Sequence, residues 1–337
     1  MTITPEYVAE YLDALAKPQG SMGRLEGLAI QLAVAQQVLP AHTNPRRIVL
    51  FAGDHGVVES GVSAWPSAVT TVMMETIIAK QATSTALAAA HMTDLRLVDV
   101  GSIKPAETGG QTSSFVNARL AAGTANLATG PAMTKEQFQA AWAAGEAEAK
   151  RAHDEGFVLL IAGEMGIGNT TPAACLTMLL ADVDAETATG HGAGSDDAIL
   201  SNKQDIVARA AERARHSLDD DPVAAIAAVA GFEIAAMAGF YAQGAAQASV
   251  LLLDGYVATS AALIAERLVP GTTEKMIAAH LSAEPGHRAA LDHLGLEPLL
   301  EWDMRLGEGT GALTALPLLD SAAALLNDVA KLSDIMP

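Results

Sequence analysis

Short apolar runs that end in glycine or an acidic residue set the hydrophobic pattern of this chain. Four are clear and a fifth is less apolar: residues 47–54, 95–101, 157–164, 248–255 and 300–307. The clear runs do not alternate between apolar and polar side chains, which is typical of strands buried on both faces of a parallel sheet. Ala-rich segments with a helical pattern, such as 67–91 and 134–153, lie between them. The pattern predicts an α/β fold in which a parallel sheet is flanked by helices.

Both ends of the chain also have helical patterns. Thr4 and Pro5 suit the cap and first turn of an N-terminal helix, and Thr134 opens a capping-box pattern farther along. Residues 310–332 have a helical pattern despite Pro317. We expect the first and last helices to pack together as a small helical unit beside the sheet.

One uncharged window, residues 234–253, has the length of a membrane span. It contains Gln243 and Gln247 and is rich in Ala and Gly, so a buried helix followed by a strand at 248–254 is the better interpretation. The first residues lack the apolar core of a signal peptide. A cytoplasmic protein without a membrane span is therefore expected.

Charge and cysteine content exclude several kinds of partner and site. The 337 residues include 39 Asp and Glu against 20 Lys and Arg, a net charge of −19. Nucleic acids and anionic membranes bind clustered positive charge, so neither is expected as a partner. Cys175 is the single cysteine, which excludes an intramolecular disulfide and a multi-cysteine metal site and fits a reducing cytosol.

Polar residues recur where the predicted strands end. Asp54–His55, Glu164, Asp254 and Glu308 each lie close to a glycine at such an end. In open parallel sheets, ligands bind beyond the carboxyl ends of the strands. These side chains are therefore expected to meet at one site.

The most distinctive of these ends is the glycine-rich loop at 163–170, GEMGIGNT. Its backbone N–H groups and the helix that follows suit an anion, yet Glu164 would repel one. The loop has neither the Lys–Ser/Thr of a Walker A motif nor a complete dinucleotide fingerprint. A plain turn in which Glu164 favours a helix N-terminus is the structural alternative.

Other polar residues have structural alternatives as well. Asp54–His55 could be a metal pair or an acid–base dyad, but no second ligand spacing accompanies it, so a loop-organising pair is the simpler interpretation. Structural positions are also the simpler interpretation of His191, His287, Cys175 and Asp196–Asp197.

Cations are scarce, so the two that lie near glycine-rich loops are candidates for contact with a phosphate. These are Lys203, in SNKQDIV, and Arg305, in MRLGEG. For Lys203 a solvated surface position is the alternative.

Seven stretches, in order along the chain, resemble the nicotinate-nucleotide–dimethylbenzimidazole phosphoribosyltransferase family. They are KPQGSMGRLE (17–26), GDHGVVESGVSAWPSAVT (53–70), GEMGIGNTTPAA (163–174), SNK (201–203), DGY (254–256), SAEPGH (282–287) and MRLGEGTGA (304–312). The resemblance covers about residues 5–335, and the third and last stretches together are highly specific. It implies a Rossmann-like α/β domain at 26–305, a small helical domain formed by 1–25 and 306–337, and a homodimer.

The resemblance also implies a reaction. Phosphoribosyl passes from nicotinate mononucleotide to 5,6-dimethylbenzimidazole, which gives nicotinate and α-ribazole 5′-phosphate with inversion at C1′, in cobalamin nucleotide-loop assembly. Such a site must hold a phosphate, take a proton from the benzimidazole and stabilise a cationic ribosyl carbon. Carboxylates in glycine-rich loops whose backbone N–H groups can bind an anion meet these demands. Glu308 is then expected to be the general base, and Glu164 a second catalytic carboxylate near the ribose or the leaving group.

The remaining site residues implied by the resemblance fall into two groups. The phosphate and nucleotide subsite is expected to contain Gly166, Gly192, Lys203, Ser282, Arg305 and Gly307. The pocket for the flat base is expected to contain Trp65, Met73, Met165 and Leu306. Because Trp65 can reshape that pocket, other benzimidazoles, purines and phenols stay open as acceptors. No metal or redox cofactor is implied, because the bond to a quaternary pyridinium nitrogen is already weak.

Two rival functions are left open by the sequence. A kinase or another nucleotide-using transferase would need a Mg²⁺ carboxylate pair and a lysine inside the glycine-rich loop, which the loop lacks. A catalytically silent binding protein for the same bases or nucleotides would not need Glu164 and Glu308 together.

Overall fold

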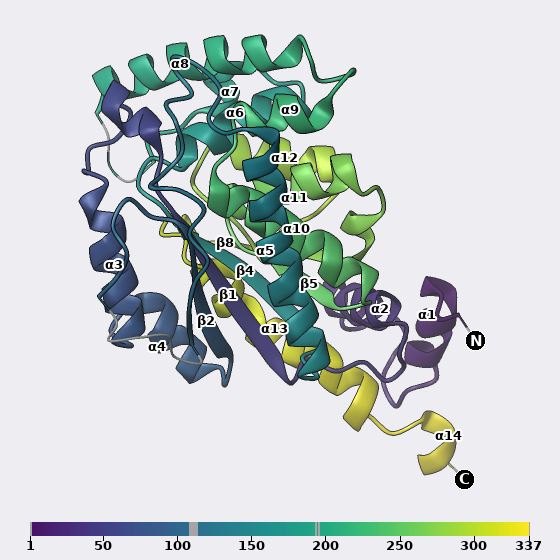
Figure 1. Cartoon of the computed structure of the whole chain (residues 1–337). Coiled ribbons are helices and arrows are strands. Elements are labelled where there is room, and N and C mark those ends of the chain that lie inside the picture. The colour runs from purple at the N-terminus through teal and green to yellow at the C-terminus, as the bar shows by residue number, and fades with distance from the viewer. Residues whose placement is uncertain (1, 108–113, 193, 195, 337) are drawn as a thin grey trace.

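The computed structural model describes residues 2–107, 114–192, 194 and 196–336. Its centre is a six-stranded sheet in the order β3-β2-β1-β4-β5-β6, with every neighbouring pair parallel (Figure 1). The strands are β1 Arg46–Gly53, β2 Asp94–Gly101, β3 Phe115–Asn117, β4 Leu159–Met165, β5 Val250–Leu253 and β6 Met276–Ala278. The strand order changes direction between β1 and β4, and ligands of such sheets bind at the carboxyl ends beside this point.

Helices cover both faces of the sheet (Figure 1). On one face, α10 Phe232–Ala246 and α11 Tyr256–Leu268 contact the strands and share a core with α5 Lys135–Asp154, α6 Thr170–Leu180, α8 Asp197–Arg215 and α9 Pro222–Ala227. The other face packs against α1 Pro5–Asp13, α2 Arg24–Gln36, α3 Ala68–Ile78, α4 Thr83–Ala90 and α13 Thr310–Asp328. Shorter helices are η1 Gly56–Ser60, α7 Ala185–Ala188, η2 Thr272–Lys275, α12 Gly286–Leu294 and α14 Leu332–Ile335.

Burial on both faces explains why the strand sequences do not alternate. In β1, Val49 and Phe51 belong to the core beneath α10, whereas Ile48 and Leu50 belong to the core beneath α13. Because successive strand side chains point to opposite faces, each face needs its own apolar residues. The predicted parallel sheet flanked by helices is confirmed.

The sequence pattern located the four main strands well and three other features poorly. In the fifth run only β8, Leu300–Glu301, is a strand, and it pairs with β7, His280–Leu281, outside the main sheet. The segment 67–91 forms two helices, α3 and α4, with Lys80 between them at φ 59°. β3 and β6 are three residues each and too short to show a period.

The apolar window at 234–253 forms the buried helix α10 and strand β5, as predicted. Among the residues that the structure describes, no helix is both long and apolar enough to cross a bilayer.

The two chain ends lie together (Figure 1). Tyr11 Oη donates to the Leu326 carbonyl at 3.0 Å, and Ala16 N donates to the Ala330 carbonyl at 2.8 Å. Thr4 caps α1 as predicted, by accepting from Tyr7 N at 3.3 Å. The core of these helices is continuous with one face of the sheet. The boundaries predicted for a separate helical domain stay a prediction.

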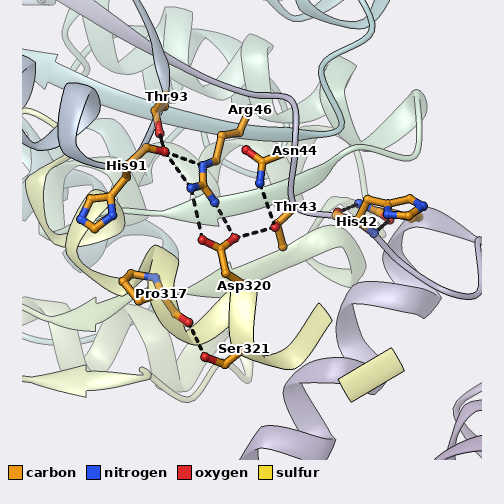
Figure 2. A network of polar contacts seen from close by, with 10 residues as sticks. His42, Thr43, Asn44, Arg46, His91, Thr93, Pro317, Asp320 and Ser321 are labelled. Atoms are coloured by element: carbon orange, nitrogen blue, oxygen red, sulfur yellow. Dashed lines mark hydrogen bonds and ion pairs between the residues drawn. The ribbon is translucent and has the colours of Figure 1, made fainter. Parts of the chain in front are cut away.

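An ion pair between the buried Arg46 and the partly exposed Asp320 fixes α13 to the amino end of β1 (Figure 2). Arg46 Nη1 lies 2.6 Å from Asp320 Oδ1, and Thr43 Oγ1 donates to the same oxygen at 2.6 Å. Arg46 also donates to the His91 carbonyl at the end of α4. These contacts tie β1, α4 and α13 together, and the opposite end of α13 follows Glu308.

Candidate active site

One cavity of about 420 Å³ opens beyond the carboxyl ends of β4 and β5. The residues that the sequence assigned to the site meet there. Its lining includes Trp65, Met73, Glu164, Met165, Gly166, Gly192, Ser282, Arg305, Leu306, Gly307 and Glu308. Lys203 does not line it, because its side chain lies behind the wall, and Asp54 and His55, which were also expected at this site, are not among its lining residues. The placement therefore agrees with the sequence, whereas the roles of these residues are a separate question.

Glu308 lies in a loop whose backbone is held in an unusual conformation. Gly307, Glu308 and Gly309 have φ values of 86°, 56° and 72°, so three successive residues occupy the left-handed region. The loop presses against β4 at Gly163, where a Cβ atom would lie 2.6 Å from Gly309 N. This close approach brings Glu308 to the end of β4, next to Glu164.

The Glu308 carboxylate is buried and one of its oxygens is already bound. Ser84 Oγ, in the first turn of α4, donates to Glu308 Oε2 at 2.8 Å. Only 4% of Glu308 is exposed, and it faces the cavity. Burial and, more weakly, the charge of Asp254 raise the pKa of Glu308, although the Ser84 hydrogen bonds oppose the rise. A carboxylate with a raised pKa and one free oxygen is suited to accept a proton from a ligand.

Glu164, the second carboxylate, is the last residue but one of β4. Burial raises its pKa to about 8, with further increases from the charges of Asp254, Glu233 and Glu308. Asn169 Nδ2 donates a short hydrogen bond to Glu164 Oε2. Glu164 is therefore mostly protonated at neutral pH. The structural alternative, a turn residue at a helix N-terminus, does not fit a carboxyl group inside the cavity.

Lys203, on α8, is buried rather than solvated, so the surface alternative is wrong. Its exposed fraction is 1%, and Nζ donates to Thr170 Oγ1 at 2.8 Å and to the Gly190 carbonyl at 2.9 Å. Burial lowers its pKa to about 8. Because Thr170 lines the cavity, Lys203 places a positive charge directly behind that wall.

Gly192 and Arg305 lie on the same side of the cavity. Arg305 Nη1 donates to the Gly192 carbonyl at 3.4 Å, while Gly192 N donates to Glu284 Oε1 at 3.0 Å. Gly166 is packed so tightly against Gly53 that a Cβ atom there would collide with the Gly53 carbonyl. Glycine is therefore required at that turn by space alone.

Ser282 is held by a neutral histidine. His287 Nδ1 accepts from Ser282 N at 2.9 Å and lies 2.9 Å from Ser282 Oγ, while Nε2 contacts Thr259 Oγ1. Burial lowers the pKa of His287 to about 3. The structural interpretation of His287 is confirmed, and Ser282 lies at the cavity wall through this contact.

The other end of the cavity is apolar. Met165 is buried, Met73 is half-buried, and Trp65 and Leu306 are exposed by 52% and 56% at the mouth. A flat, apolar ring entering here would pass between Trp65 and Leu306 and reach Glu308.

The Asp54–His55 pair organises a loop, as the simpler interpretation holds. Asp54 Oδ2 accepts from Ile103 N at 2.7 Å, and His55 Nε2 lies 2.9 Å from Glu233 Oε1 with both side chains buried. Within the part of the chain that the structure describes, no three His, Cys, Asp or Glu side chains are grouped as metal ligands.

Several polar residues at the site had no role assigned by sequence reasoning. Asn169, Asp254 and Glu284 line the cavity, and Ser84 binds Glu308 without lining it. Asp254 stood out as a strand end, and Asn169 lies in the glycine-rich loop. Ser84 and Glu284 have no local signal, because their contacts join distant parts of the chain.

Comparisons with known proteins agree with this geometry. A family model described as phosphoribosyltransferase matches residues 4–335. The nicotinate-nucleotide–dimethylbenzimidazole phosphoribosyltransferase of Cupriavidus necator is 43% identical over 335 residues, which cover 98% of this chain and 94% of that protein. The enzyme of the same name from Pseudomonas putida KT2440 is 45% identical over 322 residues, with 95% and 90% covered. A crystal structure of CobT from Thermus thermophilus superposes with a TM-score of 0.93 at 40% identity, covering 98% and 97%.

Proposed function

This chain belongs to the nicotinate-nucleotide–dimethylbenzimidazole phosphoribosyltransferase family, and on that premise we propose its reaction. It transfers phosphoribosyl from nicotinate mononucleotide to 5,6-dimethylbenzimidazole or a related lower-ligand base. The products are nicotinate and α-ribazole 5′-phosphate, with inversion at C1′, and the step belongs to cobalamin nucleotide-loop assembly.

The observation that carries the proposal is the arrangement of Glu308 and Lys203 around one cavity. Glu308 lines the cavity with one oxygen bound by Ser84, whereas the Lys203 ammonium lies behind the wall that Thr170 forms. A base therefore enters beside a proton acceptor, and a phosphate lies beside a buried positive charge.

Glu308 acts on the incoming base. Its free oxygen accepts the proton of the benzimidazole N–H while the other ring nitrogen attacks C1′ of the ribose. The bond from C1′ to the nicotinate nitrogen breaks, and its electron pair neutralises the pyridinium. A base held in place in this way contributes roughly 10²- to 10⁴-fold to the rate.

Glu164 acts next to the ribose. Its pKa of about 8 keeps it mostly protonated at neutral pH when no cation lies beside it. A pyridinium or a developing oxocarbenium cation beside it favours the ionised form, because opposite charges at short range lower the pKa of a carboxyl group. Glu164 then stabilises positive charge on C1′ as the leaving group departs.

The phosphate is held by Lys203 and Arg305, with the backbone of the loops at Gly166, Gly192 and Gly307 and the Ser282 hydroxyl completing the subsite. Arg305 and Lys203 reach the Gly190–Gly192 segment from two sides, which supports this assignment. Trp65, Met73, Met165 and Leu306 form the walls for the base. The enzyme is further proposed to act as a cytoplasmic homodimer.

A chromatographic assay tests the function. Protein is incubated with nicotinate mononucleotide and dimethylbenzimidazole, benzimidazole, adenine or a phenol, with and without EDTA. Joint appearance of nicotinate and an α-nucleotide, insensitive to EDTA, is expected. Nucleotide binding without consumption of any base would instead identify a silent binding protein, and activity that EDTA abolishes would favour a metal-dependent transferase.

A further inference from the structure

Asp254 holds the backbone that carries Glu308. It follows β5 directly, and its carboxylate accepts three backbone N–H groups from the start of α13: Oδ2 from Gly309 at 3.0 Å, and Oδ1 from Gly311 at 2.8 Å and Ala312 at 3.0 Å. The first N–H groups of a helix have no partner within the helix, so a carboxylate here satisfies them and favours the helix dipole. The first of the three belongs to the residue after Glu308.

These contacts restrict what Asp254 can do itself. It is only 2% exposed, and both oxygens already accept backbone hydrogen bonds. Asp254 lines the cavity but has no oxygen left free for a proton from a ligand, unlike Glu308. It therefore acts on the reaction through the backbone that it binds and through its charge.

The loop needs such an anchor, because its conformation is costly. A non-glycine residue with φ near 56°, such as Glu308, lies in a sparsely populated region, and the glycines on both sides also have positive φ. Strained backbone of this kind persists only where the surrounding structure holds it. On the side of the sheet, Asp254, directly after β5, binds this loop, and Gly163 of β4 and Ile48 of β1 pack closely against it.

We propose that Asp254 is the positioning residue of the Glu308 base: by binding Gly309, Gly311 and Ala312, it fixes the left-handed loop so that the Glu308 carboxylate points to the incoming base. This inference rests on the proposed function for its kinetic consequence, but the anchoring itself is a property of the folded protein.

The charge of Asp254 also acts on its neighbours. It raises the pKa of Glu308 and of Glu164. The other titratable groups facing Asp254 are His280 of β7, with Nε2 3.7 Å away, and Tyr241 of α10. Removal of the charge therefore lowers the pKa of both glutamates, and the acid limb of the rate profile shifts to lower pH.

Asp254→Asn tests the proposal, because it keeps an acceptor for Gly311 and Ala312 but loses the charge and one oxygen. The expected result is a fall in kcat on the order of 10²-fold, because a displacement of the base of about 1 Å has an effect of that size. The KM for nicotinate mononucleotide should change little, and the acid limb of kcat/KM should move to lower pH. A wild-type kcat with an unshifted pH profile would overturn the proposal.

The matched control is Asp99→Asn. Asp99 is also a buried carboxylate at a strand end, where it accepts from Gly101 N and Ser102 N, but it does not line the cavity. The substitution Asp99→Asn should lower the free energy of unfolding, while kcat and the pH profile stay at wild-type values. A similar kinetic loss in Asp99→Asn would show that Asp254 acts only through general stability.

Two readouts are independent of turnover. Hydrogen exchange at the Gly309 amide should accelerate in Asp254→Asn, and the Glu308 carboxyl, assigned by NMR through Glu308→Gln, should titrate at lower pH. If the wild type transfers phosphoribosyl to no base, the proposed function fails, and these two measurements still decide on Asp254. An unchanged exchange rate at the Gly309 amide together with an unchanged titration of Glu308 would overturn the proposal that Asp254 holds this loop.

Discussion

Ser84 Oγ donates a 2.8 Å hydrogen bond to Glu308 Oε2, although the two residues are 224 positions apart in the chain. The contact joins the first turn of α4 to the loop before α13, across one edge of the cavity. It stabilises the ionised carboxylate and leaves the second oxygen of Glu308 available.

Ser84→Ala is expected to weaken the base. Without this bond the pKa of Glu308 rises further, so a smaller fraction is ionised at neutral pH and the acid limb of kcat/KM moves to higher pH. A hydrogen bond to a charged group is worth about 1.5–3 kcal/mol, which corresponds to a fall in kcat/KM at neutral pH of roughly tenfold or more. Steady-state rates from pH 5 to 9 measure the shift. The control is Ser260→Ala. Ser260 is buried, donates to the Val257 carbonyl and does not itself line the cavity, so this variant should leave the pH profile unchanged.

Glu308→Gln should lose on the order of 10²- to 10⁴-fold in kcat, because a glutamine cannot take the proton. It keeps an acceptor for Ser84, so folding and nucleotide binding should persist. Isothermal titration with nicotinate mononucleotide and a product assay separate the two effects. Full turnover by this variant at every pH would remove Glu308 from the mechanism.

Glu164→Gln should be more stable than the wild type at high pH. The pKa of Glu164 is raised from 4.5 to about 8 in the folded state, so the folded chain holds a proton that the unfolded chain has lost between these values. Wild-type stability therefore falls as pH rises through this window, by up to roughly 5 kcal/mol. Glutamine does not titrate, so the difference in Tm should be absent below about pH 4.5, grow as pH rises through the window and be largest above about pH 8.

Glu266→Gln provides a control of opposite sign. Although burial alone would raise the pKa of Glu266, its hydrogen bonds from Gly271 and Thr273 lower it. Its ionised form therefore stabilises the fold above the unfolded pKa, and the variant should be less stable than the wild type at pH 8. Equal pH dependence in the Glu164→Gln variant and the wild type would contradict the raised pKa.

Lys203→Met should raise the KM for nicotinate mononucleotide by roughly 10- to 100-fold, because it removes the positive charge behind the cavity wall and the charge-assisted hydrogen bonds that hold Thr170 and Gly190. Because burial places the pKa of Lys203 at about 8, the wild-type KM should also increase as pH rises above that value. Initial rates at varied nucleotide concentration test both statements. Lys135→Met, which removes an exposed ion pair with Asp221, is the matched control and should leave the KM unaltered. An increase confined to the KM for the benzimidazole would place Lys203 outside the nucleotide subsite.

Trp65→Ala should change the preference among bases. The indole forms part of the cavity mouth, and a change of pocket size there is worth about 1–3 kcal/mol between ligands that differ by one or two methyl groups. The ratio of kcat/KM for dimethylbenzimidazole to that for benzimidazole should therefore change by roughly tenfold, with the KM for the nucleotide constant. Trp302→Ala, which removes a tryptophan that is 64% exposed and outside the cavity lining, should not alter this ratio.

Local features of the sequence determined the regular elements of this protein. The unalternating apolar runs identified β1, β2, β4 and β5, because a strand buried on both faces needs apolar residues at every position. The capping box of Thr134 and Gln137 fixed the start of α5 in the same way, since its two hydrogen bonds join residues three apart. The glycine-rich loops pointed to the correct edge of the sheet, because the carboxyl ends of parallel strands meet there.

Only the tertiary structure decided how the site residues are held. Ser84, Asp254 and Glu308 lie on separate elements, and no spacing in the sequence shows that the first two bind the loop of the third. The same holds for Lys203: a lysine is usually solvated, but its ammonium here is enclosed by Thr170 and the Gly190 carbonyl, and no local pattern shows those partners. Sequence pattern reports contacts between residues a few positions apart. The pKa of a buried group depends instead on charges and donors brought together by the fold, and these are fixed only when the sheet and helices pack.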